Sequence, residues 1–358
     1  MRKEVLLAHF PKISVSRYRR LLTHFGSLEE AWRAGAGAWR DAPWDSALRE
    51  EFFLWKERID EAAIERTLQA EEIGCLTSND SGYPPLLKKI YDPPFCLFVR
   101  GGLAPLINPL AVVGTRSSTP YGRQVATELV TALAARGVTI VSGLALGIDG
   151  VAHEAALAAG GKTVAVLGTG INRSNVYPSA HRSLAERIVK NGGAMVSEYP
   201  PGTEPTGYSF PRRNRIIAGM SLGTVVIEAG ETSGALITAE CSADGGRDVF
   251  AVPQNITSPT AAGVNRLLKQ GAHPVTSADD ILDILRISTL QTIVKEQRSP
   301  TDDPATAGIR QYLSRTPIHI NDLTKQTGLP SAVVNSTMAI MELEGQARHI
   351  GGMRYVAA

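Results

Sequence analysis

The densest group of functional side chains is a run of basic residues beside an aromatic ring, near the middle of the chain. The run consists of Phe210, Arg212, Arg213, Asn214 and Arg215. Guanidinium groups next to a ring suit single-stranded nucleic acid, because its unstacked bases can stack on the ring while the cations bind phosphate. The plainer alternative is a solvated helix start held by salt bridges. That alternative suits Arg213 best, since Arg212 and Arg215 are three residues apart and share a helix face.

Three turns built from small residues offer backbone amides that could bind an anion. Small side chains let N–H groups approach phosphate, and the start of a following helix adds partial positive charge. Arg116 adds a bidentate donor to the first turn. Each turn alone could be a tight connection, but three on one sheet edge predict a continuous rim of donors. The candidate residues are Gly114, Thr115, Arg116, Ser142, Gly143, Gly168 and Gly170.

A fourth stretch, from Glu228 to Thr238, contributes hydroxyl groups at another predicted helix start. Ser233 and Thr238 could donate to phosphate. Glu228 is the one carboxylate that would suit a general base or a ribose ligand, but no carboxylate, His or Cys adjoins it in sequence to form a pair. Asp149, after the second turn, is expected to cap its helix. We therefore predict a binding site without catalytic residues.

The turns follow short apolar, β-branched runs that are predicted to be strands. The runs lie at 110–113, 138–141, 163–167, 194–196, 224–227 and 249–252. Ala- and Leu-rich helical stretches separate most of them, an alternation typical of a doubly wound parallel sheet. Ligands of such sheets bind outside the carboxyl ends of the strands. Because the first turn lacks a GxGxxG fingerprint and no acidic residue ends the second strand, we expect no dinucleotide cofactor.

The flanking segments predict three further parts of the chain. Residues 1–75 are expected to be helical throughout, with two short helices meeting near Gly26 and Ser27 as an N-cap. They loosely resemble a helix-hairpin-helix or SAM-like module, but the 13–16 stretch lacks the glycines of a DNA-binding hairpin, which favours packing or partner binding. The proline-rich stretch that follows predicts an edge strand at 93–98. We assign 76–288 to the sheet domain.

The C-terminal part is predicted to be a linker at 289–307 and a winged-helix domain at 308–358. Gly351 and Gly352 permit the hairpin of the wing. The expected third helix, around 331–342, contains no Lys or Arg, so reading of a duplex major groove is poorly supported. A regulator of duplex DNA is therefore a weaker hypothesis.

The bulk composition limits the classes of function. The 358 residues carry a formal net charge of only +2, so any charge that binds nucleic acid must be local. The 3 cysteines form no CxxC or ligand cluster, which favours a reducing compartment and argues against structural zinc. Since no run of about 18 apolar residues occurs, we expect a cytoplasmic protein without a membrane partner, a metal or a cofactor.

Seven motifs occur in the order found in the DprA (DNA-processing protein A, or Smf) family, which the chain resembles over about residues 80–285. The resemblance implies an extended Rossmann-like domain that binds single-stranded DNA, forms homodimers, protects incoming DNA and helps to load a RecA-type recombinase during natural transformation. The motifs are GTRSSTPYG (114–122), SGLALGID (142–149), VLGTGINRSNVYP (166–178), SEYPPGTEP (197–205), FPRRNRIIAG (210–219), EAGETSGALITA (228–239) and GVNRLLKQGA (263–272).

The resemblance also assigns residues. It implicates Arg116 and the FPxRNR motif in the DNA site, which restores Arg213 as a binding candidate. The chain departs from the family at His181, where an asparagine with a basic neighbour is frequent, so a phosphate contact there would need Arg173 or Arg182. Gln254 stands where a glycine is usual. The rival hypothesis is a Rossmann-like phosphoribohydrolase, which would carry a PGGxGT turn and paired acids.

Overall fold

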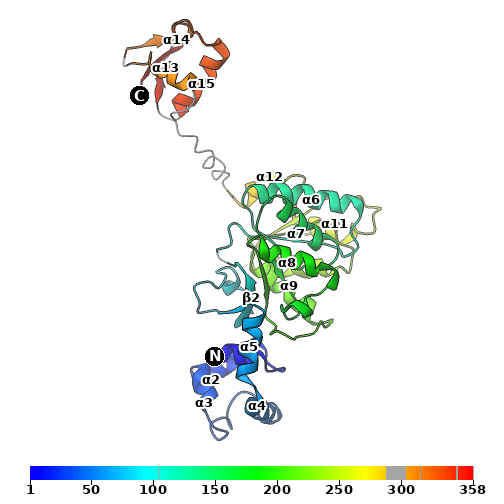
Figure 1. Cartoon of the computed structure of the whole chain (residues 1–358). Coiled ribbons are helices and arrows are strands. Elements are labelled where there is room, and N and C mark those ends of the chain that lie inside the picture. The colour runs from blue at the N-terminus through cyan, green and yellow to red at the C-terminus, as the bar shows by residue number, and fades with distance from the viewer. Residues whose placement is uncertain (104, 288–303, 315, 344–345, 358) are drawn as a thin grey trace. The chain divides into compact units, whose positions relative to one another are not determined.

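The computed structural model describes residues 1–358 apart from 104, 288–303, 315, 344–345 and 358, and it divides the chain into two compact units, 1–289 and 290–358 (Figure 1). Most of the predicted linker therefore lies outside the described residues. Its last residues, 304–307, form the start of a helix in the second unit. The N-terminal helices and the sheet belong to the same unit.

The first unit is built on a nine-stranded sheet with the strand order β1-β2-β6-β5-β4-β3-β7-β8-β9. The strands are β1 (Ile73–Thr77), β2 (Cys96–Gly101), β3 (Leu110–Val113), β4 (Ile140–Ser142), β5 (Thr163–Val166), β6 (Ala194–Ser197), β7 (Gly223–Val226), β8 (Asp248–Ala251) and β9 (His273–Pro274). From β6 to β9 all neighbours pair in parallel, whereas β1 and β2 add antiparallel pairs. The predicted doubly wound α/β fold is confirmed, with winding that reverses between β3 and β7.

Two expectations for the edge of this sheet were wrong. Residues 73–75, which were predicted to be helical, belong to strand β1, because residues 73–77 find an antiparallel partner in β2. Strand β2 is an inner strand rather than the predicted edge, since β1 covers one side and β6 the other. The short parallel strand β9, on the opposite edge, was not predicted.

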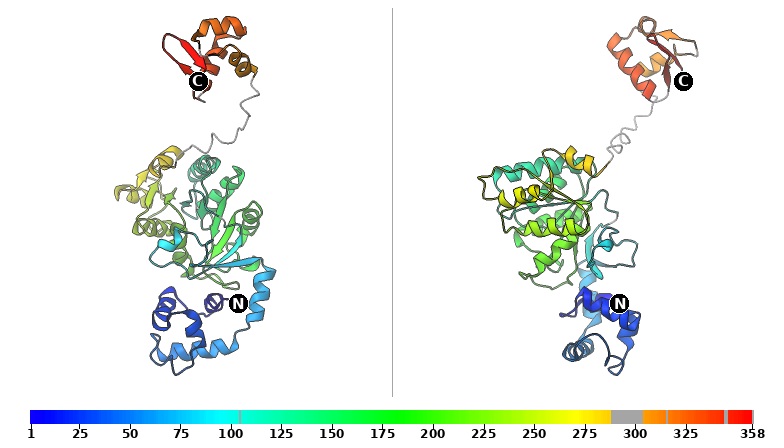
Figure 2. Two further views of the ribbon diagram at one scale, coloured as in Figure 1. Left: turned by 90° about the vertical axis from the view of Figure 1, so that its left-hand side faces the viewer. Right: turned by 180° about the vertical axis from the view of Figure 1, so that it is seen from behind.

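Helices cover both faces of the sheet because successive apolar residues of each strand point to opposite sides. On one face, Val113 and Val226 pack with residues of α9 (Ser209–Gly219), α10 (Gly234–Asp244) and α11 (Ala262–Lys269). The other face is covered by α6 (Pro120–Ala135), α7 (Ile148–Ala158), α8 (Arg182–Lys190) and α12 (Ala278–Ile284). Figure 2 shows the sheet between these layers.

The N-terminal helices enclose an aromatic core of their own, which includes Phe10, Trp39 and Phe52. They are α1 (Lys3–Ala8), α2 (Val15–Phe25), α3 (Leu28–Arg33), α4 (Ser46–Arg58) and α5 (Glu61–Ala70). Ser27 caps α3 as predicted. Helix α1 packs against β1 and β2, and Tyr18 of α2 stacks on Phe95 with ring centroids 4.4 Å apart. These contacts join the helices to the sheet.

The second unit has the predicted winged-helix architecture. Its elements are α13 (Pro304–Arg310), β10 (Ile318–His319), α14 (Ile320–Thr327), α15 (Ser331–Leu343), β11 (Ala347–His349) and β12 (Arg354–Ala357). The strands pair antiparallel in the order β10-β12-β11. Gly351 and Gly352 take positive φ values of 96° and 59°, which only glycine adopts readily, and they close the wing.

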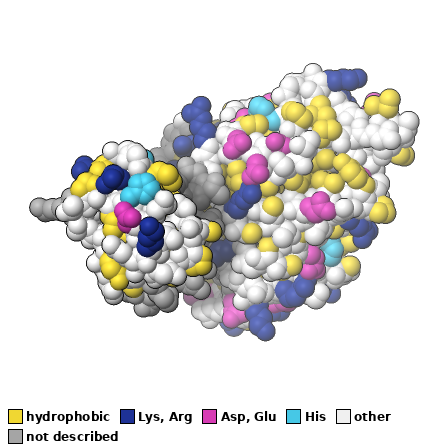
Figure 3. Space-filling model, turned by 90° about the horizontal axis from the view of Figure 1, so that it is seen from above, with side chains coloured by type: hydrophobic (Ala, Val, Ile, Leu, Met, Phe, Trp, Pro, Cys, Tyr) yellow, Lys and Arg dark blue, Asp and Glu magenta, His cyan; other side chains and the backbone are white. Residues whose placement is uncertain are grey.

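Charged side chains of both signs are interspersed on the face seen in Figure 3. Lys and Arg side chains are thus not concentrated in one patch on that face. No helix among the described residues is long and apolar enough to cross a membrane. Within the same residues, no group of three or more His, Cys, Asp or Glu side chains is placed to hold a metal ion.

Candidate nucleic-acid interface

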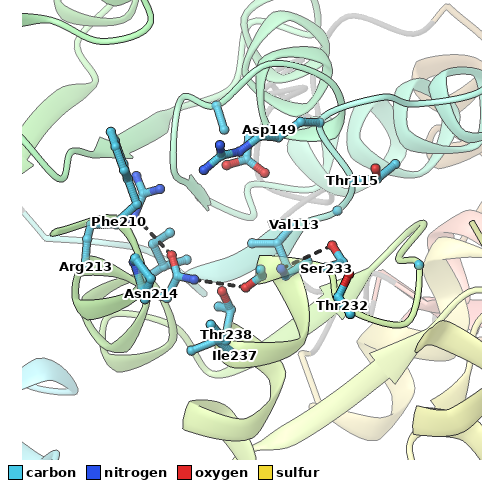
Figure 4. A pocket seen from close by; sticks show the side chains of 18 residues that line it. Val113, Thr115, Asp149, Phe210, Arg213, Asn214, Thr232, Ser233, Ile237 and Thr238 are labelled. Carbon is cyan, nitrogen blue, oxygen red and sulfur yellow. Dashed lines mark hydrogen bonds between the residues drawn. The ribbon is translucent and has the colours of Figure 1, made fainter. Parts of the chain in front are cut away.

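A pocket of about 470 Å³ opens at the carboxyl ends of β3 and β7, where the winding of the sheet reverses. Ligands of doubly wound sheets bind at this position. Its walls come from the turn after β3, the first turns of α9 and the start of α10 (Figure 4). The structure brings eight of the predicted residues into the lining: Gly114, Thr115, Arg116, Phe210, Arg213, Asn214, Ser233 and Thr238.

The turn after β3 holds an exposed cation on a fixed backbone. The amide of Thr115 donates to the Glu228 carbonyl at 2.7 Å, and its carbonyl accepts from Ile148 at 3.2 Å. Gly114 must be glycine, because a Cβ there would lie 2.6 Å from the Ile148 side chain. Arg116 is exposed and takes part in none of the ion pairs formed among the described residues. Its guanidinium group is therefore available to a ligand.

An aromatic pair lies beside this cation. The Arg116 guanidinium is 5.7 Å from the centroid of the Phe210 ring. On the other side, Tyr177 contacts Phe210 with centroids 5.4 Å apart, and Tyr177 is 47% exposed. Arg116 and Phe210 line the pocket, and Tyr177 extends the aromatic surface beyond its lining, so that an unstacked base can stack there. Tyr177 was not among the predicted site residues, although its position after the third turn was visible in the sequence.

Arg213 lines the pocket from inside the protein. It is 4% exposed and donates to the carbonyls of Gly143, at 2.6 Å, and Val166. Its Nε donates to the Asn214 Oδ1 at 3.2 Å, and the Asn214 amide donates to the Gly234 carbonyl at 3.0 Å. Burial lowers the pKa of Arg213 to about 10, so the group stays charged at neutral pH. Arg213 therefore ties the ends of β4 and β5 to α9.

A buried carboxylate also lines the pocket. Asp149 is 6% exposed and accepts from the Gly143 amide at 3.1 Å. Burial raises the pKa of Asp149. The expected capping role was wrong, because Gly147 occupies the N-cap of α7 and Asp149 lies in the first turn. Ser142 is fully buried and donates to the Val112 carbonyl at 2.6 Å, outside the pocket lining.

The third turn supports the site without lining it. A Cβ on Gly168 would lie 3.0 Å from the Phe210 ring, so the absent side chain lets that ring pack closely. The Gly170 amide donates to the Thr203 carbonyl at 3.0 Å. The amides of Thr115 and Gly143, in the first two turns, are likewise bound within the protein. These N–H groups hold the turns in shape, so they do not contribute to the predicted rim of donors.

Arg212 and Arg215 lie outside the pocket, in a charged cluster on the far side of α9. Arg215 donates to Glu198 at 2.6 Å, and the Arg212 Nε lies 3.4 Å from the same carboxylate. Both guanidinium groups also lie within 4 Å of Asp92. Their side chains are only 22% and 14% exposed. Two carboxylates thus balance two cations, and little of this charge is free for a ligand.

Glu228 is a structural acceptor rather than a reactive group. It is wholly buried and accepts from the Thr119 amide at 2.9 Å, from the Thr119 hydroxyl at 2.6 Å and from the Thr260 hydroxyl at 3.2 Å. The contacts join β7 to the start of α6. A carboxylate that is buried and bound by three donors is not positioned to act on a substrate in the pocket.

The start of α10 faces the pocket with hydroxyl and amide groups. Ser233 is the N-cap of this helix, and Thr232, Ser233 and Gly234 line the pocket. The N-terminus of an 11-residue helix carries partial positive charge. Together with Arg116, it makes this part of the pocket suited to an anion such as a phosphate.

Comparison with known proteins identifies the family. A sequence model of the DNA recombination-mediator protein A family matches residues 74–286, which include every element around the pocket. The chain belongs to the DNA recombination-mediator protein A family. A DprA winged helix domain model matches residues 294–353. The first match confirms the family that the ordered motifs predicted, and the second matches most of the winged-helix unit.

Among relatives of this family, Protein Smf of Escherichia coli is 49% identical over 205 residues, which are 57% of this chain and 54% of that protein. The matched region thus spans about half the length of that relative. DprA of Bacillus subtilis is 42% identical over 215 residues, covering 60% of this chain and 71% of that protein.

Two solved structures of the same family resemble the fold. DprA from Streptococcus pneumoniae matches with a TM-score of 0.68 and 34% identity, covering 78% of this chain and 95% of that one. DprA from Helicobacter pylori, described for its single-stranded DNA binding mode, matches with a TM-score of 0.54 and 29% identity, covering 60% of this chain and 96% of that one.

Proposed function

We propose that the chain binds single-stranded DNA at the pocket between β3 and β7, without catalysing a reaction. One observation carries the proposal: the Arg116 guanidinium, which is exposed and forms no ion pair among the described residues, lies beside the Phe210 ring in the pocket lining. The single-strand binding described for the Helicobacter pylori relative supports it.

The residues take different roles in this proposal. A phosphate lies at the start of α10, where Ser233 and Arg116 donate to it and Thr238 supports the wall. A neighbouring base stacks on Phe210, and the Asn214 amide keeps α9 and α10 together. Arg213 positions the wall from within, and Arg212 and Arg215 hold α9 through their carboxylate partners. Gly114, Thr115, Ser142, Gly143, Gly168 and Gly170 shape the backbone around them.

The proposed role in the cell is based on the family to which the chain belongs. We propose that the chain protects incoming single strands in the cytoplasm, helps to load a RecA-type recombinase in natural transformation, and acts as a homodimer whose two sites raise avidity. An enzymatic role on nucleotides is disfavoured by the burial and full hydrogen bonding of Glu228. Asp149 is then the one carboxylate in the pocket lining.

A competition experiment with the full chain tests the proposal. Fluorescence anisotropy with a labelled single strand should show displacement by unlabelled single strand and much weaker displacement by duplex of equal length. The affinity should fall steeply with salt, because each neutralised phosphate releases counterions. Equal competition by duplex would contradict the proposal. Release of free base from nucleoside monophosphates would instead support the hydrolase.

A further inference from the structure

A second hollow, of about 530 Å³, lies between the N-terminal helices and the sheet. We call it the interdomain cleft. One wall comes from residues 8–15 and Arg17, and the other from Phe95 and parts of 198–212. We propose that the interdomain cleft is a second subsite for the DNA strand that occupies the pocket between β3 and β7. The strand passes from the pocket to the cleft over the start of α9. The inference rests on the proposed function and extends it to the N-terminal helices.

The position of α9 makes the two hollows neighbours. Phe210 and Pro211 line the pocket, whereas Ser209 and Arg212, in the same first turn, line the cleft. The hollows are thus separated by about the width of one helix, ~10 Å. An unstacked strand crosses this distance in about two to three nucleotides, because its phosphates lie further apart than the ~3.4 Å rise of duplex DNA. Tyr208, 68% exposed, lies at the N-cap between them and lines the cleft.

The charges of the cleft favour an anion. Arg17 is the cation that no carboxylate neutralises: it donates to the Lys12 carbonyl and takes part in no ion pair among the described residues. Lys12 pairs with Glu51 at 2.5 Å, but both side chains are about half exposed, so solvent weakens the pair. Glu198, the carboxylate in the lining, is already bound by the arginines of α9. Burial lowers the pKa of His9, which keeps it neutral.

An unsatisfied donor points to the same kind of ligand. The Tyr199 hydroxyl is buried and has no hydrogen-bond partner among the described residues, although Tyr199 lines the cleft. Burial raises the pKa of Tyr199, so the group remains a donor at neutral pH. Buried polar groups are almost always paired. Because this oxygen has almost no accessible surface, a phosphate in the cleft can accept from it only after a small rotation of the Tyr199 ring, while Phe95 offers an apolar surface to a sugar or base.

A length series tests this subsite. The full chain is titrated with oligo(dT) of about 3 nucleotides, which is too short to occupy both hollows, and of about 15 nucleotides, near the upper end of single-strand site sizes. We expect the longer strand to bind more tightly to the wild type. Arg17→Ala should weaken binding of the longer strand about fivefold and lower its salt slope by about 1, with little effect on the shorter strand. Tyr199→Phe, which removes only an unpartnered hydroxyl, should also weaken only the longer strand.

Arg20→Ala is the matched control, because Arg20 is exposed on the same helix and does not line the cleft. It should change neither affinity by more than about twofold. Three results would overturn the subsite: unchanged binding in both cleft variants, equal losses for short and long strands, or an equal loss in the control. If the wild type bound neither strand, the proposed function would fail as well. Thermal melting of each variant identifies losses caused by unfolding.

Discussion

The turn after β3 and the first turns of α9 both place arginine at the pocket, yet they use it in opposite ways. Arg116 is exposed and has no ion-pair partner in the described part of the chain, and an aromatic ring is its neighbour. In α9, Arg213 is buried against carbonyl groups, and Arg212 and Arg215 share two carboxylates. The α9 run has three times as many cations but offers less charge to a ligand. Charge density along a sequence is therefore a poor measure of the charge that a site presents.

The largest expected effect is a loss of stability on substitution of Arg213, the buried arginine of α9. Arg213→Ala would leave the Gly143 and Val166 carbonyls without their donor and remove a cation near Asp149. The free energy of unfolding should fall by about 3 kcal/mol, because buried polar groups lose their partners. Urea denaturation measures it. A loss no larger than that of Arg116→Ala would erase the distinction between the two regions.

The buried side chain of His153 should make the folded protein less stable in acid. Burial, with smaller effects of His181 and Arg213, lowers the pKa of His153 to about 3. The folded chain therefore keeps His153 neutral, while the unfolded chain binds a proton below its ordinary pKa of about 6.5. The contribution of neutral His153 to the free energy of unfolding is fully present above about pH 6.5. It decreases as the pH falls from there towards 3. The free energy of unfolding should drop by about 2 kcal/mol between about pH 7 and about pH 5.

The matched variant for this acid effect is His153→Gln. Its stability should depend less on pH over the same window, as urea denaturation at several pH values would report. Asp149, whose pKa is raised by burial, acts with the opposite sign, but it is present in both wild type and variant, so the difference between their pH profiles reports His153. Identical pH profiles for wild type and variant would show that His153 titrates normally, contrary to its burial.

Substitution of the exposed arginine, Arg116, should change the affinity for single strands rather than the stability of the protein. Arg116→Ala should weaken single-strand binding about tenfold and reduce the salt slope by about 1, because one phosphate contact is lost. Its free energy of unfolding should stay within about 0.5 kcal/mol of the wild type. Anisotropy titrations at several salt concentrations measure the first effect, and an unchanged slope would remove Arg116 from the site.

Arg215→Gln removes the same unit charge and should have the smallest effect on affinity. Since Arg215 is held by Glu198 and Asp92 and lies outside the pocket, we expect a change below about threefold, from its long-range field alone. The titrations used for Arg116 measure it. An affinity loss as large as that of Arg116→Ala would mean that paired arginines of α9 reach the DNA.

Much of the fold was predictable because it depends on local patterns. The β-branched runs placed strands β3 to β8 within a few residues, and the glycine pair placed the wing. Strand β1 was missed because its partner β2 begins about twenty residues later and nothing local distinguishes it from the helices before it. Salt bridges of the α9 arginines were predicted only as an alternative, and chiefly for Arg213, whereas Arg212 and Arg215 form them. Their partner Asp92 is more than a hundred residues away in sequence, which no local pattern reveals.

The hydrogen bonds that run from Arg213 through Asn214 connect four elements into one rigid frame. They link Gly143 and Val166, at the ends of β4 and β5, to Gly234 at the start of α10. A ligand that arrives at this frame meets a preorganised wall and loses little entropy in ordering it. Association should then be limited by encounter and electrostatic steering rather than by rearrangement, so that affinity differences between strands arise mainly in their dissociation rates.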